Sequence, residues 1–559
     1  MWTRLAPLAG AAVVAFAAGA AVGSGEEDPR RSTAGEFADA WSRSDYATMH
    51  SLLTPEARRR VTLRRFAATY RRAARVATLS GLSAGRPEEP RDGTVAVPVV
   101  LRTRIFGTLS GSIALPVDKL EDDAAVEWRP YLVHPGLRRG EKLSRTTTLP
   151  PRAAIQARDG TPLAEGEARL SELGALASEI AGRVGPAPPE RAAELARRGV
   201  PPGAPVGLTG LEREFDEQLA GRPGGVLRAG DRVLASVSPR RGSAVRTTID
   251  PDVQRAAVEA LAGRLGGIAV IRPRDGEVLG LAGVAYSAPQ PPGSVFKIVT
   301  LAAALEAGVA KTTSKYPVQT ATTLEGVELE NAHGEACGGT LRTAFAHSCN
   351  SVFAPMGAKL GAERLVAAAE RFGFNEDPGL AGALRSTIPA AAEIGDDLAV
   401  GSTAIGQGQV LATPVAVAAV AGAIGMDGLR VRPTLRKGTA PERTRAATPK
   451  AAAAIGRFMR AAVTSGTGVG AAIPGVKVAG KTGTAELRDT TNDDPDPGDP
   501  DAPPIDDRTD TDAWFAAYAP ARRPRVAVAV LLVGQGAGGE TAAPAARVVL
   551  EAALKRRGR

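Results

Sequence analysis

The amino-acid sequence predicts a multidomain α+β protein, and three observations lead to this fold class. The chain has 559 residues, of which 44% are apolar, so it can form two to four domains with sizeable cores. Near the N-terminus, helical patterns are followed by alternating strand patterns. Toward the C-terminus, strands are followed by helices and then by strands again. That order favours an antiparallel sheet flanked by helices, which both ends of a domain build around an inserted, all-helical subdomain.

Residues 1–25 predict a membrane anchor or a signal peptide. They contain Arg4, then apolar or small residues, and a charged run comes after them. A segment of roughly 20 apolar residues can span a bilayer, and a basic residue ahead of it favours an outside location for the rest of the chain. The small residues also suit a cleavable signal peptide, and this alternative stays open. We expect a single-pass protein of the cell membrane whose other domains are extracytoplasmic.

Residues 32–145 predict one small α+β domain. The stretches "FADAWSRSDYATMHSLL" and "ARRRVTLRRFAATYRRAARVA" carry apolar residues at helical spacing, and the second is strongly basic. The stretches "TVAVPVVLRTRIF", "GTLSGSIALPV" and "AVEWRPYLV" then read as strands with turns between them. We interpret the arginines of the basic helix as a solvated face.

Residues 146–245 predict a spacer or pedestal domain. They are rich in Gly, Pro and Arg, and a polar helix is expected near 168–184. We find no combination of residues there that is typical of catalysis.

Residues 246–559 predict the third folded domain. Asp250-Pro251 suits a helix start, and Asp275-Gly276 suits the turn of a hairpin in "GGIAVIRPRDGEVLGLAG". A helical region comes next, and "VKVAGKTGTAEL", "AWFAAYAP" and "RVAVAVLLVGQ" supply the last strands. The acidic, Pro-rich stretch 488–512 has almost no apolar residue, so we expect a disordered loop. A Ca²⁺ site is the alternative, but the spacing does not fit an EF-hand loop.

Composition excludes several classes of function. The net charge is +9 and few aromatic residues lie near the basic ones, which favours weak attraction to anionic polymers or lipid headgroups over nucleic-acid binding. The four His and two Cys show no metal-ligand spacing, so no metal site is expected. Cys337 and Cys349 could pair in an exported chain, or could be two small buried thiols. The sequence leaves both possibilities open.

The stretch "GVKVAGKTGTAEL", which begins at Gly475, fits two motifs with different chemistry. Its first eight residues fit the phosphate-binding G-x-x-x-x-G-K-[ST] loop, and Lys481-Thr482-Gly483 fits a K-T-G element. A phosphate loop needs a helix directly after it, so that backbone N–H groups face the phosphates. Here a strand-like composition precedes Lys481, and an acidic run comes after the motif. We therefore reject the phosphate loop.

Ser294 and Lys297 form an S-x-x-K pair at the start of a nearly all-apolar helix. Residues three apart share a helix face, so the two side chains are expected to lie close together. Burial would lower the pKa of Lys297 and make its amine a base for the Ser294 hydroxyl. Taken alone, the pair is better explained by a helix-capping Ser and a Lys that extends to solvent.

Two further elements come later along the chain. Ser348 and Asn350 fit S-x-N, and Lys481, Thr482 and Gly483 fit K-T-G, with Thr484 next on the strand. A second Ser can relay a proton, Asn can bind an amide, and Lys can attract a carboxylate. Each element is weak alone, but the three in this order form the set that penicillin-binding enzymes share.

On these residues the chain resembles a class B penicillin-binding protein, a monofunctional peptidoglycan D,D-transpeptidase. The stretches "AIGQGQVLATPVAVA" and "AWFAAYAP" also resemble this family. The N-terminal domain, with "AWSRSDYATMHSLL" and "VEWRPYLVHPGL", resembles the nuclear-transport-factor-like domain of the methicillin-resistance type, and "LPPRAAIQARDGTPLA" resembles the dimerisation or pedestal region. The likeness covers nearly the whole chain.

This resemblance implies a role for each motif. Ser294 would attack the penultimate D-Ala carbonyl of a stem peptide and form an acyl-enzyme, with Lys297 as the general base. Ser348 and Lys481 would pass the proton to the departing D-Ala. β-Lactams would be trapped at Ser294.

The substrate contacts come from the same motifs. The resemblance implies that Asn350 binds the peptide amide and that Thr482 and Thr484 bind the donor carboxylate. Gly483 would let the substrate backbone approach the strand closely. Backbone N–H groups of Ser294 and Thr484 would form the oxyanion hole. No cofactor or metal is implied, and a glycosyltransferase partner would supply the glycan polymer.

Two departures and several alternatives remain. Arg152-Ala153 and Ala157-Arg158 stand where the family has Arg-Gly and Asp-Arg, which leaves the non-catalytic interface in doubt. A D,D-carboxypeptidase would differ only in its acceptor. A β-lactamase would need a deacylating base, and we find no E-x-x-L-N. A β-lactam sensor or a cell-wall scaffold is the non-enzymatic alternative. The acidic stretch beside the K-T-G strand could act as a lid.

Overall fold

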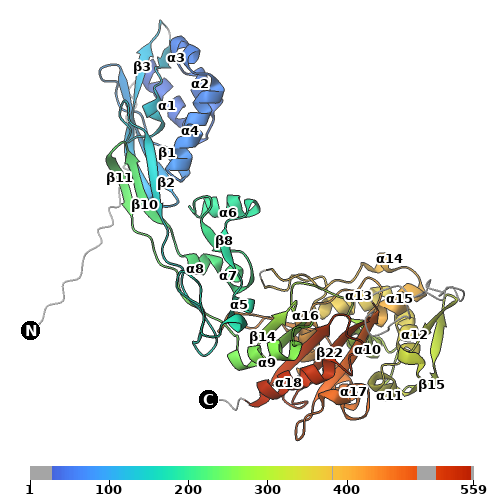
Figure 1. Cartoon of the computed structure of the whole chain (residues 1–559). Coiled ribbons are helices and arrows are strands. Elements are labelled where there is room, and N and C mark those ends of the chain that lie inside the picture. Colours follow the sequence, from blue (N-terminus) through green and yellow to red (C-terminus); the bar gives the residue numbers. More distant parts are fainter. Residues whose placement is uncertain (1–27, 122, 381, 487–510, 556–559) are drawn as a thin grey trace, which may run out of the picture. The chain divides into compact units, whose positions relative to one another are not determined.

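The computed structural model describes residues 28–121, 123–380, 382–486 and 511–555 (Figure 1). The predicted anchor or signal peptide, residues 1–25, and nearly all of the acidic stretch lie outside the described residues. Within the described ranges, no helix is both long enough and apolar enough to cross a membrane. The chain divides into two compact units: the first holds the residues up to Thr148 together with 197–199 and 224–238, and the second holds the rest.

The first unit has the predicted order of helices followed by a meander. Four helices come first: α1 (Pro29–Ser42), α2 (Tyr46–Ser51), α3 (Pro55–Arg60) and α4 (Leu63–Val76). The strands β1 (Leu79–Ala84), β2 (Thr94–Thr103), β3 (Gly107–Lys119) and β4 (Ala124–Val126) then pair in chain order. The apolar face of α4 carries Phe66 and Tyr70 into an aromatic cluster with Trp128, whereas its arginines are exposed.

A second, three-stranded sheet completes the first unit. It has the order β11-β10-β5 and consists of Arg232–Val237, Gly224–Ala229 and Leu143–Thr148, all antiparallel. The range 146–245, which the sequence predicts as one domain, therefore contributes residues to both units. Its boundaries stay a prediction.

The second unit begins with short elements in place of the long polar helix expected near 168–184. Residues 166–169 and 172–174 form turns, and only α5 (Ala175–Ala181) is helical, because Gly174 has a φ of +55° and starts the helix late. The other elements here are β6 (Ile155–Gln156), β7 (Pro162–Ala164), β8 (Val184–Pro186), α6 (Ala192–Arg197), β9 (Pro205–Gly207), α7 (Gly210–Glu214), α8 (Asp216–Ala220) and β12 (Val245–Arg246).

A buried ion network ties these short elements together. Arg152 donates to Glu212 at 2.5 Å and to Asp216 at 2.8 Å, and Arg169 donates to Glu212 at 2.7 Å. Arg191 donates to the other oxygen of Asp216 at 2.9 Å. Arg152 matches the Arg of the family's Arg-Gly pair, and only the next residue, Ala153, differs. The ion network shows that Arg152 is an internal structural residue.

Glu212→Ala is expected to destabilise the second unit by about 3–5 kcal/mol, because it leaves the largely buried guanidinium group of Arg169 without a carboxylate and leaves Arg152 with Asp216 alone. Glu212 is 0% exposed. Calorimetry of thermal unfolding measures the change. Glu194→Ala is the matched control, since the Glu194 side chain is 44% exposed beside Arg191 and its pair is worth at most about 1 kcal/mol. Equal losses in the two variants would contradict a structural role for the network.

The central sheet of the second unit is built by both ends of the domain, as predicted. Its order is β14-β13-β23-β22-β21, and every neighbouring pair is antiparallel. The strands are Glu277–Gly283, Gly266–Arg272, Val526–Leu532, Thr511–Ala519 and Ala479–Glu486. Because both faces of the sheet are buried, the strands are apolar throughout rather than alternating.

Helices cover both faces of this sheet (Figure 1). On one face, α9 (Pro251–Leu261) and α18 (Ala542–Lys555) form a core with Val528 and Val530 of β23. On the other face, α16 (Pro414–Gly425) packs with the alternate residues of the same strand. β21 is the edge strand, so its outer side is available to the inserted subdomain.

The inserted region is mainly helical, but it also contains short strand pairs. The helices before α16 are α10 (Lys297–Glu306), α11 (Leu341–Ala346), α12 (Asn350–Leu360), α13 (Ala362–Arg371), α14 (Ala391–Ile394) and α15 (Asp397–Ala404), and α17 (Pro449–Ser465) comes after it. The strand pairs are β15–β18 (Lys315–Gln319, Cys337–Thr340), β16–β17 (Ala321–Leu324, Val327–Glu330) and β19–β20 (Leu429–Val431, Arg443–Arg445).

The prediction of an all-helical insertion missed these hairpins. The turn between β16 and β17 has Glu325 at a φ of +48° and Gly326 at +82°, the two positive values that suit a tight hairpin. Gly326 is a turn signal that the sequence shows, but the strands beside it are too short and too polar to be predicted from their pattern.

Candidate active site

Ser294 lies in a 3₁₀ turn, Gly293–Phe296, directly before α10. The expected helix therefore starts at Lys297, three residues later than predicted. Gly293 has a φ of +50°, and a Cβ there would overlap the carbonyl oxygen of Thr484. A Cβ on Gly406 would likewise overlap the carbonyl oxygen of Gly293, whose N–H donates to Gly406 at 3.0 Å. These two glycines hold the Ser294 turn against strand β21.

Lys297 is 0% exposed and points into the S-x-N residues. Its Nζ lies 2.6 Å from the Ser348 carbonyl oxygen, 2.6 Å from Asn350 Oδ1 and 3.3 Å from Ser348 Oγ. It also lies 5.6 Å from the centre of the Phe353 ring. Among the described residues, no hydrogen bond joins Lys297 to Ser294 directly.

Lys481 approaches the same hydroxyl from the K-T-G strand. It is 0% exposed, and its Nζ donates to Ser348 Oγ at 2.8 Å and to the Thr482 carbonyl oxygen at 2.9 Å. The Ser348 hydroxyl is therefore shared between two buried lysines, one from α10 and one from β21. The structure brings Lys297, Ser348, Asn350 and Lys481 into one hydrogen-bonded cluster.

Burial changes the protonation of both lysines. It lowers the pKa of Lys297 well below the ordinary value, and the nearby charge of Lys481 lowers it further. Burial also lowers the pKa of Lys481, to about 7. Burial therefore favours the neutral amine form of Lys297, which can accept a proton, and near neutral pH Lys481 is divided between its two forms. The Ser348 hydroxyl between them can pass a proton from one to the other.

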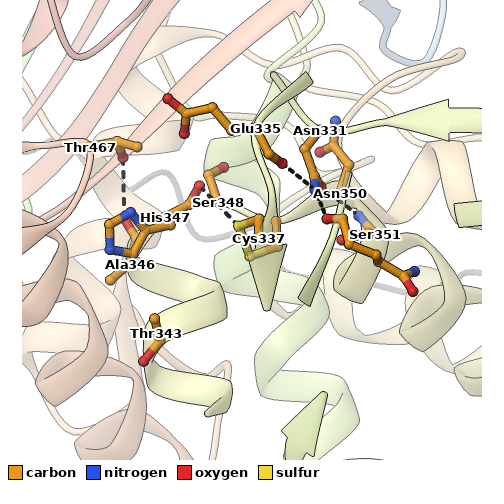
Figure 2. Close-up of a disulfide and its surroundings, with 12 residues drawn as sticks. Asn331, Glu335, Cys337, Thr343, Ala346, His347, Ser348, Asn350, Ser351 and Thr467 are labelled. Atoms are coloured by element: carbon orange, nitrogen blue, oxygen red, sulfur yellow. Dashed lines mark hydrogen bonds between the residues drawn. A yellow bond between two sulfur atoms is a disulfide. The ribbon is translucent and has the colours of Figure 1, made fainter. Parts of the chain in front are cut away.

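The loop that carries Ser348 is held in a strained conformation. Ser348 has a φ of +63°, which is uncommon for a residue other than Gly. Cys337 and Cys349 form a disulfide, with their Cα atoms 5.4 Å apart (Figure 2). Of the two possibilities that the sequence left open, pairing is therefore the correct one. Because Cys349 lies between Ser348 and Asn350, the disulfide attaches the S-x-N motif to strand β18.

Asn331 is a further support that the sequence analysis missed. It is 4% exposed, its Nδ2 donates to Gln319 and Glu335 carbonyls at 2.8 and 3.0 Å, and its Oδ1 accepts from the Ser351 N–H at 2.9 Å (Figure 2). The preceding carbonyl of Glu330 accepts from Asn350 Nδ2 at 2.8 Å. A lone Asn in a turn between short strands carries no signal that could have found it.

Reduction of the disulfide is expected to slow acylation of the protein by penicillin by roughly tenfold, because the Ser348 loop loses its covalent attachment to strand β18. The chain has only these two Cys, so a reductant acts on a single bond. Stopped-flow acylation rates with and without reductant measure the effect. The double variant Cys337→Ser, Cys349→Ser should be equally slow and insensitive to reductant. An unchanged rate in both experiments would show that the remaining contacts suffice.

The K-T-G residues after Lys481 divide between packing and polar contacts. A Cβ on Gly483 would lie 2.9 Å from the Pro292 carbonyl oxygen and 2.9 Å from Trp514 Cβ, so Gly is needed for the strand to approach the Ser294 turn. The Thr482 hydroxyl lies 2.5 Å from that of Thr467. Thr484 is half-buried beside the turn. In the part of the chain that the structure describes, no cluster of three His, Cys, Asp or Glu side chains could hold a metal ion.

Comparison with known proteins identifies this constellation. Residues 266–551, about half of the chain, match the penicillin binding protein transpeptidase domain. The chain is a class B penicillin-binding protein. In this penicillin-binding protein, residues 160–243 match the penicillin-binding protein dimerisation domain, and residues 30–141 match an NTF2-like N-terminal transpeptidase domain.

Named relatives agree with this family. The chain is 34% identical over 419 residues to the peptidoglycan D,D-transpeptidase PbpA of Mycolicibacterium smegmatis, which covers 62% of this chain and 80% of the relative. The solved structure of penicillin-binding protein A from M. tuberculosis as a ceftriaxone acyl-enzyme has a TM-score of 0.57 at 28% identity, covering 72% of this chain and 98% of that one. A D,D-transpeptidase domain from Eggerthella lenta gives 0.58 at 27% identity, with coverage of 72% and 98%.

Proposed function

We propose that this penicillin-binding protein is a peptidoglycan D,D-transpeptidase with Ser294 as its nucleophile. The observation that carries the proposal is the cluster of two buried lysines on one Ser348 hydroxyl, directly beside the Ser294 turn. Such a cluster can take up and deliver protons near neutral pH. It therefore suits a reaction in which a hydroxyl loses a proton and a leaving amine gains one.

The reaction has two balanced steps. First, Ser294 Oγ bonds to the carbonyl carbon of the penultimate D-Ala, its proton passes to Lys297, and the C–N bond to the terminal D-Ala breaks. Lys481 protonates the leaving amine through Ser348. In the second step the amine of another stem peptide attacks the ester, its proton returns to the cluster, and Ser294 Oγ leaves with a proton.

Substrate contacts are inferred from the same geometry. Asn350 Oδ1 accepts a hydrogen bond from Lys297. Asn350 lies at the start of α12, where it can bind the amide of the donor peptide. Thr482 and Thr484 would hold the donor carboxylate. The Ser294 and Thr484 N–H groups would receive the developing oxyanion.

The relatives support this assignment. The two mycobacterial PbpA proteins are named peptidoglycan D,D-transpeptidases. The M. tuberculosis protein has been solved as acyl-enzymes with ceftriaxone, imipenem and penicillin G. We infer that β-lactams acylate this chain too.

The location and partners are inferred from the chain as a whole. Residues 1–25 have the pattern of an anchor, and the Cys337–Cys349 disulfide fits an oxidising, extracytoplasmic compartment. A transpeptidase cross-links strands that are already polymerised, so a glycosyltransferase activity must supply its substrate. The ranges 32–145, 146–245 and 246–559 are our proposed domain limits.

A donor peptide ending in D-Ala-D-Ala, supplied with and without an amine acceptor, tests the function on the full-length protein in detergent. Mass spectrometry of the products should show acceptor-dependent transfer with release of D-Ala. Release of D-Ala to water alone would favour a D,D-carboxypeptidase. Fast hydrolysis of penicillin without a lasting adduct would favour a β-lactamase.

A further inference from the structure

Thr467 lies outside the three catalytic motifs but contacts one of them directly. It comes after α17 in the turn Gly466-Thr467-Gly468, and its hydroxyl oxygen lies 2.5 Å from that of Thr482 in the K-T-G strand. Its backbone N–H donates to the carbonyl oxygen of Ala346 at 3.1 Å. Ala346 ends α11, two residues before Ser348. Thr467 therefore joins the K-T-G strand to the helix that leads into the S-x-N motif.

The surroundings fix Thr467 closely. A Cβ on Gly466 would overlap the Ala346 carbonyl oxygen, and a Cβ on Gly539 would overlap the carbonyl oxygen of Thr467. The backbone of Thr467 is thus enclosed on both sides, which limits the directions in which its hydroxyl can point. Its two hydrogen-bond neighbours are Thr482 Oγ and, at 3.3 Å, the Ala346 carbonyl oxygen.

The arrangement of hydroxyl protons has two states. A Thr hydroxyl has one proton to donate and two lone pairs that accept. If Thr467 donates to Ala346, Thr482 must donate to Thr467, and its proton points away from the substrate. If Thr467 donates to Thr482, the proton of Thr482 is free to point outward. The Ala346 carbonyl already accepts the Thr467 N–H, so the second state leaves no acceptor unpaired.

We propose that Thr467 is a specificity-determining positioning residue, which donates to Thr482 and thereby directs the Thr482 proton at the carboxylate of the acyl donor. This rests on the proposed function, in which Thr482 holds that carboxylate. A donor with an anionic carboxylate draws the pair into the second state, because hydrogen bonds to a charged acceptor are about twice as strong as neutral ones. A neutral ester in the same place gains much less. Thr467 therefore raises the preference of the site for anionic donors without touching them.

The test compares penicillin G with its methyl ester as acylating agents of the full-length protein. Thr467→Val removes the hydroxyl at nearly constant volume. It should lower the second-order acylation rate for penicillin G by roughly tenfold and change the rate for the ester by about twofold at most. Thr467→Ser keeps the hydroxyl and should keep the wild-type preference. Thr482→Val should lose the same preference, and the double variant should lose little more.

The thermal midpoint of each variant separates preference from folding, and Thr467→Ala serves if the Val variant is unstable. Equal losses for penicillin G and the ester would overturn the proposal, because a purely structural residue would affect both. An unchanged preference in the Val variant would overturn it as well. Absence of acylation in the wild-type protein would instead overturn the proposed function on which it rests.

Discussion

Ser294→Ala is expected to abolish covalent labelling by penicillin and all release of D-Ala. The variant removes the atom that forms the ester, while the turn Gly293–Phe296 keeps its backbone contacts with β21 and Gly406. We expect no adduct at any concentration at which the wild-type protein is fully labelled. Gel fluorescence with a fluorescent penicillin measures the loss, and the thermal midpoint shows that the fold is kept.

Ser351→Ala is the matched control for that experiment. Ser351 lies on α12 near the same cluster and is 5% exposed, but its hydroxyl has no hydrogen-bond partner among the described residues. Its replacement should therefore leave labelling close to the wild-type level. Full labelling of the Ser294→Ala variant would show that another nucleophile, such as Ser348, forms the adduct.

Lys297→Met is expected to slow acylation by roughly 10²–10⁴-fold, the usual contribution of a general base. The variant keeps most of the length of the side chain, but it removes the amine that faces Ser348, Asn350 and the Phe353 ring. Stopped-flow acylation measures the rate. Lys359→Met, at an exposed position of α12, should have no effect. A loss of less than about threefold would mean that Lys297 is structural and that the proton of Ser294 leaves by another route.

The pH dependence of wild-type acylation is set by the two lowered lysine pKa values. Falling pH protonates Lys297, whose pKa lies well below the ordinary value, so the rate should decrease on the acid side. Rising pH removes the proton of Lys481, whose pKa is about 7, so the rate should also decrease above pH 7. Both lysines contact the Ser348 hydroxyl, so the two apparent pKa values of the pH–rate profile describe the pair of lysines and not one lysine each. In Lys297→Met the acid limb should disappear.

The sequence predicted the main sheet and the residues of the cluster for different physical reasons. Long apolar strands at both ends of a domain have few ways to be buried, so it could be inferred that the two ends build one antiparallel sheet. Lys297, Ser348 and Lys481 were found because each lies in a short motif of defined chemistry. Their mutual distances could not be found this way, because they depend on how α10, the S-x-N loop and β21 pack.

The residues that the sequence analysis missed act through contacts distant in the chain. Asn331 supports Ser351 from twenty positions away, and Thr467 reaches Thr482 from fifteen. Gly406 is needed because the backbone of Gly293 lies against it and because its own φ is +84°. A single polar or small residue in a turn has no periodicity and no partner in its own neighbourhood, so nothing local marks it.

Mass spectrometry of the penicillin-treated, full-length protein tests the central claim most directly. The intact mass should rise by one penicillin, and digestion should place the adduct on the peptide that contains Ser294. Addition of an amine acceptor together with a D-Ala-D-Ala donor should yield the transfer product from unlabelled protein only. An adduct on the Ser348 peptide, or no adduct with intact transfer, would contradict Ser294 as the nucleophile.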